Sequence, residues 1–330
     1  MIYLDSAATS LQKPPAVARA CSYAISHYAS PGRGGHKPAM DAAAAAFACR
    51  EAAARLFQVP KPEQVVFTNN ATHGLNIAIK ALVRPGGTVV ISGYEHNAVT
   101  RPLHAIPDVT VRVAAGQLFR PEETVEAFRK ALTPEVTAAV FTHVSNVFGM
   151  ILPIQELARL CRERGVPFIL DASQSAGCLP VHLEELGAAF IAMPGHKGLY
   201  GPQGTGLLLC GQTPPPLLEG GTGSESIRQE MPDFLPDRLE AGTHNMPGIA
   251  GLLAGVRFVR QLGPEAICAG ERQLTFQAAE GLRRLPGLQV FALPDLAAQA
   301  GVLSIVPERI DAEALGAALA DRGIAVRAGL

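Results

Sequence analysis

The chain has 330 residues, of which 48% are hydrophobic and 17% charged, so it can bury a large core and is not a disordered protein. Its 28 basic and 29 acidic residues leave a net charge of -1, which gives no overall field for binding nucleic acid or an anionic membrane surface. No apolar stretch approaches the ~18 residues that span a bilayer, and no basic leader precedes the first apolar residues. We therefore expect a soluble, cytoplasmic protein that acts on small molecules.

Short β-rich runs alternate with helical patterns through most of the chain, which is typical of βαβ units and a mainly parallel sheet. Continuous apolar runs such as Phe168-Ile169-Leu170 indicate strands covered by helices on both faces. Seven strands are predicted, at residues 64–68, 88–92, 110–113, 138–142, 167–171, 190–193 and 206–210. Helices are predicted between them, at residues 40–57, 72–82, 121–132 and 154–164.

A Gly/Pro-rich stretch over residues 194–247 ends this rhythm and leads into a smaller unit. The elements predicted there are helices at residues 247–262, 265–284 and 311–322, and strands near 288–292 and 302–306. We predict an α/β protein with a large domain over residues 15–250 and a smaller α+β domain over 251–330, with an N-terminal segment, 1–14, associated with the small domain.

Polar residues gather directly after the predicted strands, where ligands bind in an open parallel sheet. They form the segments Asn69-Asn70-Ala71-Thr72-His73-Gly74, Glu95-His96-Asn97, Ser145-Asn146 and Asp171-Ala172-Ser173-Gln174. The first segment opens a helix and could bind a phosphate, although most such segments are ordinary helix caps. Asp171 by itself is most simply an ion-paired or capping residue, but the cluster of polar strand ends favours a site.

Lys197 lies between Gly195-His196 and Gly198 at the end of the sixth predicted strand. A positioned, partly desolvated lysine can form a Schiff base, although an isolated lysine is usually a solvated surface charge. The glycine-rich run 201–206 precedes a strand instead of opening a helix, which argues against Rossmann and Walker nucleotide loops. The six cysteines are widely spaced, with no zinc-type cluster, so we predict a reducing compartment and no metal site.

These motifs, taken in order, resemble the class V aminotransferase-type pyridoxal phosphate (PLP) enzymes of the cysteine desulfurase family, the branch related to selenocysteine lyase. The resemblance extends from Tyr3 to Leu330. It implies a fold type I PLP-dependent transferase and a homodimer. It also implies conversion of L-cysteine to L-alanine, with the sulfur left on an enzyme cysteine as a persulfide and passed to a sulfur-acceptor protein.

The resemblance implies a role for each matching residue. Lys197 would hold PLP covalently and move the substrate Cα proton, Asp171 would pair with the pyridinium nitrogen, and His96 would stack on the ring. Alternatively, His96 is an unrelated packed histidine. The other implied cofactor contacts are Asn146 and Gln174 at the 3'-oxygen, and Thr72, the Ala71 and His73 amides and His196 at the phosphate.

Three further positions match segments of the family that lie around the site. Thr222, in the Gly220–Ser224 run, resembles the loop that reaches the partner subunit's phosphate, its alternative being a flexible Gly/Ser turn. Asn245 matches a segment near the substrate mouth, and Arg327 matches one that in the family leads into the loop with the nucleophilic cysteine; we predict that both bind substrate.

The expected nucleophilic cysteine and carboxylate-binding arginine of the family would lie beyond Leu330. We therefore expect a truncated chain, inactive in desulfuration, unless it is a natural short form. Cys178 is most simply a small buried residue. Selenocysteine lyase or another class V activity remains an alternative within enzymes, and a non-catalytic dimeric scaffold or sulfur-transfer partner remains one outside them.

Overall fold

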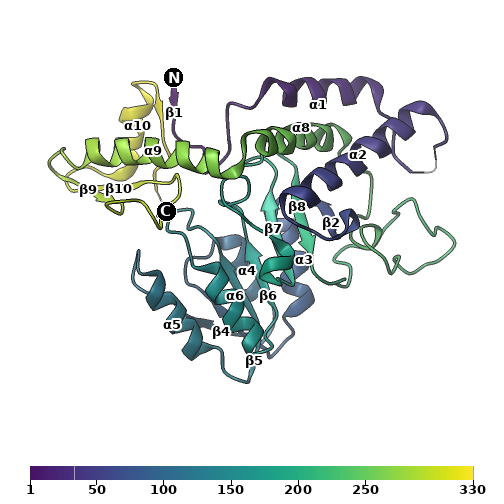
Figure 1. The fold of residues 1–330 in the computed structure, drawn as a ribbon, viewed down its shortest axis with the longest axis horizontal. Coiled ribbons are helices and arrows are strands. Elements are labelled where there is room, and N and C mark those ends of the chain that lie inside the picture. Colours follow the sequence, from purple (N-terminus) through teal and green to yellow (C-terminus); the bar gives the residue numbers. More distant parts are fainter. Residues whose placement is uncertain (33, 330) are drawn as a thin grey trace.

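A seven-stranded sheet organises the chain in the computed structural model, which describes residues 1–32 and 34–329 (Figure 1). Its strands are β2 (Val65–Thr68), β3 (Thr88–Ile91), β4 (Thr110–Val113), β5 (Val136–Thr142), β6 (Phe168–Asp171), β7 (Phe190–Pro194) and β8 (Gly206–Cys210). The spatial order is β2-β8-β7-β6-β5-β3-β4. Strand β8 runs antiparallel to β2 and β7, and the other pairings of this sheet are parallel. The predicted α/β fold with a mostly parallel seven-stranded sheet is confirmed.

Hydrophobic cores cover both faces of the sheet except at the edge strand β4, whose residues are mostly exposed. Successive side chains of a strand point to opposite sides and so enter different cores. In β5, Ala139 and Phe141 belong to one hydrophobic core, whereas Ala138 and Val140 belong to the other. The helices that contribute to the first core are α2 (Lys37–Leu56), α5 (Pro121–Ala131), α6 (Ile154–Glu163), α7 (Leu183–Leu186) and α8 (Met246–Leu262). Helices α3 (Ala71–Leu82) and α4 (Asn97–His104) contribute to the second core. Three layers result, with the sheet between two layers of helices.

A smaller unit lies to one side of the sheet (Figure 1). Its elements are α9 (Pro264–Leu282), the antiparallel pair β9 (Leu288–Phe291) and β10 (Ser304–Pro307), α10 (Ala312–Ala320) and β11 (Ile324–Ala325). Strand β1 (Ile2–Tyr3) pairs in parallel with β11, so the N-terminus begins beside this unit. Helix α1 (Pro15–His27) then packs on α8. The predicted domain boundary near residue 250 falls within α8, and the division into domains stays a prediction.

Every predicted strand and helix is present, with ends shifted by a few residues. Sequence patterns did not indicate α1, α4, α7, β1, β11 or the 3-10 turns η1 (Pro62–Gln64) and η2 (Asp237–Leu239). Helix α4 contains Pro102, a residue that usually limits helices, whereas α1 begins with Pro15 in its first turn, where proline is tolerated. Strands β1 and β11 pair opposite ends of the chain, which no local pattern reveals. Leu330, where the expected truncation falls, lies outside the described residues, as does Arg33.

No helix within the described residues is both long and apolar enough to cross a membrane.

Candidate active site

A cavity of about 170 Å³ opens at the carboxyl ends of β2, β3, β5, β6 and β7. Its lining residues are Asn70, Ala71, Thr72, His96, Ala98, Thr142, Val144, Asn146, Asp171, Ser173, Gln174, Pro194, His196 and Lys197. Five separate strand ends therefore bring most of the predicted site residues to one place, as expected for the uncovered edge of a parallel sheet.

Lys197 lies on a turn after β7 whose backbone is packed too closely for any residue but glycine at two positions. A Cβ atom at Gly198 would lie 2.3 Å from the Ala176 carbonyl oxygen, and one at Gly195 would lie 2.2 Å from Thr205 Oγ1. These close approaches hold the backbone on both sides of the lysine. The turn thus presents the Lys197 amine from a rigid support.

The amine of Lys197 is half-buried, and the nearby carboxylates compensate only part of the cost of burying its charge. Burial lowers its pKa, and Arg327 lowers it further, whereas the carboxylates of Asp171 and Asp5 oppose this shift. A lysine with a lowered pKa has a larger neutral fraction at a given pH, and only the neutral amine attacks a carbonyl carbon. The environment therefore favours a nucleophilic lysine.

Asp171 ends β6 and is 2% exposed. Its Oδ1 accepts hydrogen bonds from the Ser173 amide, at 2.9 Å, and from the Ser173 hydroxyl. Among the described residues, no group donates a hydrogen bond to Oδ2. The carboxyl group is thus fixed through one oxygen, while the other is left for a cationic or N–H partner at the cavity.

His96 is the N-cap residue of α4, and its Nδ1 accepts a hydrogen bond from the Ala98 amide at 3.0 Å. Because Nδ1 accepts, the proton of the neutral ring lies on Nε2. The carboxylate of the preceding Glu95 accepts hydrogen bonds from the Ser92 and Gly93 amides, at 2.9 and 2.7 Å. Burial raises the pKa of Glu95 and these hydrogen bonds oppose the shift. The Glu95 hydrogen bonds therefore fix the turn before His96, and the Ala98 hydrogen bond orients the His96 ring at the cavity.

The start of α3 supplies the candidate anion site, with one change to the expected set of donors. Asn70 caps the helix, and its side-chain oxygen accepts a hydrogen bond from the His73 amide at 2.8 Å. That amide is therefore already engaged, and the residues at this helix end that line the cavity are Asn70, Ala71 and Thr72. Burial lowers the pKa of the His73 side chain, which does not line the cavity.

The remaining polar lining residues approach the cavity from two sides. Gln174 donates a hydrogen bond through Nε2 to the Ala7 carbonyl at 3.0 Å, which leaves its second N–H for a ligand. His196 Nδ1 lies 3.0 Å from Thr9 Oγ1. Burial, followed by the charges of Lys197 and Lys13, lowers the pKa of His196, so its ring remains neutral to lower pH than usual.

Besides His73, three predicted site residues lie outside the cavity lining. Thr222 interacts with Ser224, with 3.1 Å between the hydroxyl oxygens. Asn245 caps α8 by accepting a hydrogen bond from the Gly248 amide at 3.0 Å. Arg327 forms a two-point ion pair with Asp5, at 3.0 and 2.9 Å, and still influences the pKa of Lys197. Their functional roles stay predictions.

All six cysteines are free thiols in the structure, and none lines the cavity. Burial raises the pKa of Cys178 strongly and that of Cys161 to about 12. Nucleophilic attack requires the thiolate, which such thiols do not form near neutral pH. The buried, inert interpretation of Cys178 agrees with this environment.

Asn70, Ser173 and Thr142 line the cavity, but sequence reasoning did not select them as functional. A signal existed for the first two: Asn70 is a typical N-cap residue before an apolar helical pattern, and Ser173 follows the strand-end Asp171 by two residues. Thr142 is hidden within a strand and carries no comparable local signal.

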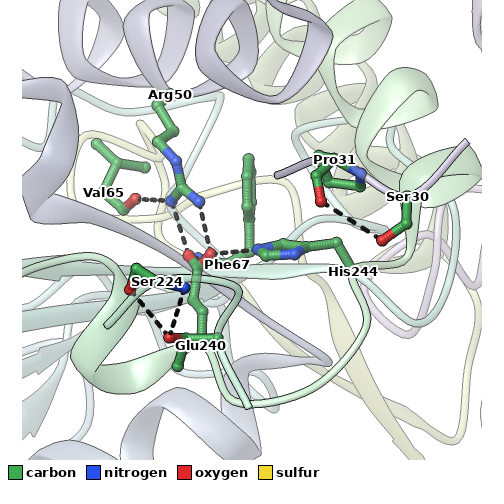
Figure 2. A network of polar contacts seen from close by, with 9 residues as sticks. Ser30, Pro31, Arg50, Val65, Phe67, Ser224, Glu240 and His244 are labelled. Carbon is green, nitrogen blue, oxygen red and sulfur yellow. Dashed lines mark hydrogen bonds and ion pairs between the residues drawn. The ribbon is translucent and has the colours of Figure 1, made fainter. Parts of the chain in front are cut away.

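A second polar cluster, the Arg50 network, lies at the β2 edge of the sheet (Figure 2). Arg50 and Glu240 are 7% and 8% exposed and form a two-point ion pair at 2.7 and 2.5 Å. The Glu240 carboxylate also accepts a hydrogen bond from the Phe67 amide and contacts His244 Nε2, both at 2.6 Å. The guanidinium lies 4.1 Å from the centre of the Phe67 ring. This network joins α2, β2 and the segment that leads into α8.

The chain is similar to proteins named as cysteine desulfurases. The chain is 34% identical to the "Probable cysteine desulfurase" of Xylella fastidiosa (strain Temecula1 / ATCC 700964), covering 100% of this chain and 81% of that protein. It is 31% identical to the "Probable cysteine desulfurase 2" of Mycobacterium leprae, covering 100% of this chain and 82% of that protein.

Two solved structures share the fold. The apo structure of the cysteine desulfurase from Thermococcus onnurineus NA1 has a TM-score of 0.88 and 28% identity, covering 99% of this chain and 84% of that one. The cysteine desulfurase CsdA of Escherichia coli has a TM-score of 0.87 and 26% identity, covering 98% and 83%. The fold is that of a fold type I PLP-dependent enzyme. The chain belongs to the aminotransferase class-V family, whose model matches residues 2–330.

The residues of the cavity fit PLP. The half-buried Lys197 amine suits the aldehyde, the open Oδ2 of Asp171 suits the pyridinium N–H, and the start of α3 suits the phosphate. These three groups line one cavity.

Proposed function

We propose that the protein is a PLP-dependent cysteine desulfurase that converts L-cysteine to L-alanine and transfers the sulfur to a thiol. The observation that carries the proposal is the half-buried Lys197 amine, which shares a cavity with Asp171 in a chain whose relatives are named cysteine desulfurases. In a purely structural scaffold, neither the partly desolvated Lys197 amine nor the Asp171 oxygen that accepts no hydrogen bond would have a task.

In this proposal each lining residue has a task that its surroundings support. PLP, when bound, supplies an electron sink for negative charge at the substrate Cα. Lys197 holds the cofactor and then takes the proton from Cα, and Asp171 holds the proton on the pyridinium nitrogen. His96 packs against the ring, its plane set by the Ala98 hydrogen bond.

The other lining residues orient the group. Thr72, the Ala71 amide and His196 bind the phosphate, while Asn146 and Gln174 bind the 3'-oxygen. The His73 amide has a smaller role than expected, because Asn70 already accepts its hydrogen bond.

Sulfur transfer also needs a thiolate that attacks the sulfur of the substrate. A bond forms between the two sulfur atoms and the Cβ–S bond breaks, with its electron pair left on Cβ. Protonation of Cβ and return of a proton to Cα by Lys197 then give L-alanine, and the acceptor thiol becomes a persulfide. Since none of the six cysteines lines the cavity, we propose that the attacking thiol comes from outside these six positions, and that a sulfur-acceptor protein is a partner.

The proposal is tested by incubating the PLP-loaded chain with L-cysteine in D₂O. We expect deuterium at Cα of recovered substrate, and alanine together with persulfide sulfur only when an external thiol such as dithiothreitol is added. Lys197→Ala should lose the Cα exchange, whereas Lys80→Ala, which removes an exposed lysine of α3, should retain it. Exchange no faster than that of free PLP would contradict the proposal.

We further propose a homodimer in which Thr222 reaches the phosphate of the partner subunit. Thr222 lies outside the cavity of its own chain, and large apolar side chains are exposed on α1 and α2, among them Ile25 and Met40 at 72% and 61%. Such exposed groups are typical of surfaces that associate. Sedimentation at micromolar concentration should give a dimer, and Thr222→Ala should weaken PLP binding. A monomer with full PLP occupancy would contradict this arrangement.

We propose that Asn245 and Arg327 contribute to the substrate mouth and that the enzyme works in the cytoplasm. The electrostatic influence of Arg327 on Lys197 supports the first point, and the six free thiols support a reducing compartment. Arg327→Gln should raise the KM for L-cysteine with little change in kcat, and cell fractionation should recover the protein with cytoplasmic markers.

A further inference from the structure

The N-terminal segment crosses directly over the turn that carries Lys197. The Ser10 amide and hydroxyl both donate to the His196 carbonyl oxygen, at 3.1 and 3.0 Å, and the hydroxyl also lies 3.2 Å from the Lys197 carbonyl oxygen. The Thr9 hydroxyl adds a further contact to the His196 carbonyl, at 3.2 Å. We call Thr9, Ser10 and Lys13 the strap. Its hydrogen bonds hold the Lys197 turn in addition to the close glycine contacts with Ala176 and Thr205.

Lys13 is the unusual member of the strap. It is half-buried, and its ammonium donates to the Ser10 carbonyl at 2.8 Å, the Ser10 hydroxyl at 2.9 Å and the His196 carbonyl at 3.3 Å. Among the described residues, no carboxylate lies within ion-pair distance of this ammonium, and burial lowers its pKa. A partly buried cation without a counter-ion has a desolvation cost that a simple surface anchor need not have. All three of its hydrogen bonds go to the strap itself and to the residue before Lys197.

We propose that Lys13, acting with Ser10, is a positioning residue that fixes the backbone of the Lys197 turn and thereby holds the Lys197 amine in its partly desolvated place. This inference rests on the proposed function, since the amine is what it positions. Lys13 acts through geometry: the charges that influence Lys197 come from Asp171, Arg327 and Asp5, whereas the charge of Lys13 influences His196.

Loss of Lys13 should therefore loosen the turn and let the Lys197 amine reach more water. Its pKa would then rise toward the ordinary value, because burial is the main cause of its lowering. A rise of one pKa unit reduces the neutral fraction of an amine about tenfold at neutral pH. A role in stability alone would leave the reactivity of folded Lys197 unchanged.

The experiment measures the rate at which PLP and borohydride label Lys197, over a range of pH, in the 330-residue wild type and four variants. Lys13→Met should slow labelling about tenfold at neutral pH and move the midpoint of the pH profile upward. Lys13→Arg keeps the charge and the donors and should stay within about twofold of the wild type. Ser10→Ala should slow labelling about threefold, and Lys80→Met, the matched loss of an exposed lysine, should have no effect.

Thermal unfolding of each variant separates positioning from folding. Lys13→Met with a lower unfolding temperature but the wild-type labelling rate and pH midpoint would overturn the inference and leave the proposed function intact. Lys13→Arg as slow as Lys13→Met would overturn it as well. If Lys13→Met does not fold, the Ser10→Ala profile decides in the same way. A wild type without label on Lys197 would contradict the proposed function, and the inference would fall with it.

Discussion

The Arg50 network and the Lys197 cavity are both polar and partly buried, but they differ in how fully their groups are paired. Both oxygens of Glu240 have partners, and Arg50 donates to Glu240 and to the Val65 carbonyl. In the cavity, by contrast, Asp171 keeps one oxygen without a donor among the described residues, and the charge of Lys197 is only partly balanced. Complete pairing marks a group that holds the fold together, whereas spare hydrogen-bonding capacity marks a group that meets a ligand.

Asp171→Asn gives the largest expected effect and addresses the cavity side of the comparison. Asparagine keeps the shape and can still accept from Ser173, but it cannot stabilise a proton on a ring nitrogen. We expect Cα exchange to fall about 100-fold, the scale of losing one electrostatic stabiliser in an active site. The free energy of unfolding should change by about 1 kcal/mol or less. An exchange rate within twofold of the wild type would place Asp171 among structural residues.

Arg50→Met should have the opposite profile. Removing the cation leaves the Glu240 carboxylate buried without its main partner, which costs about 3–5 kcal/mol of stability. The double variant Arg50→Met/Glu240→Met should lose less, because it leaves no unpaired charge. Urea unfolding of the two variants measures both values. Labelling of Lys197 in the folded fraction should match the wild type. A selective loss of labelling would contradict the purely structural role of the Arg50 network.

Acid should remove the stability that the Arg50 network contributes, because the Glu240 carboxylate becomes protonated. Burial by itself would raise the pKa of Glu240, but Arg50 and His244 outweigh it and hold that pKa below its ordinary value of 4.5. The carboxylate therefore contributes stability above pH 4.5, and this contribution disappears as the pH falls through the lower folded pKa. The free energy of unfolding should drop more steeply below that pH in the wild type than in Glu240→Gln. Parallel curves would mean that Glu240 is not ionised in the folded state.

Cys178→Ala should have the smallest effect. The thiol is buried, donates to the Gln174 and Ser175 carbonyls and lies outside the cavity lining. We expect about 1 kcal/mol of lost stability and an unchanged rate of thiol-dependent alanine formation. Loss of alanine formation in this variant, with Cα exchange retained, would identify Cys178 as the sulfur nucleophile and contradict the assignment of the six cysteines.

Sequence patterns could predict the cavity because its parts repeat one local signal, a polar residue directly after a strand. Asp171 and Lys197 carry this signal in separate strands, and the parallel sheet brings the strand ends together. His143 carries the same signal but does not line the cavity, because successive strand residues point to opposite faces and its neighbours Thr142 and Val144 take the cavity side. Burial instead lowers the pKa of His143 to about 3.

The strap and the Arg50 network could not be predicted in this way, since each joins positions that are far apart in the chain. Thr9 and His196 are 187 residues apart, and Arg50 and Glu240 are 190 apart. A lysine at position 13 or a glutamate at position 240 resembles any surface charge until the fold shows that Lys13 is half-buried and Glu240 is buried. Such long-range polar contacts depend on the whole topology, which local periodicity does not contain.

The most direct test of the central claim is to load the 330-residue chain with PLP, reduce it with borohydride and map the labelled peptide by mass spectrometry. The contrast between an open and a closed polar cluster predicts a single label on Lys197, absent in Lys197→Ala and retained in Lys80→Ala. A label on another lysine, or labelling of Lys197→Ala at the wild-type level, would contradict the assignment of this cavity as the active site.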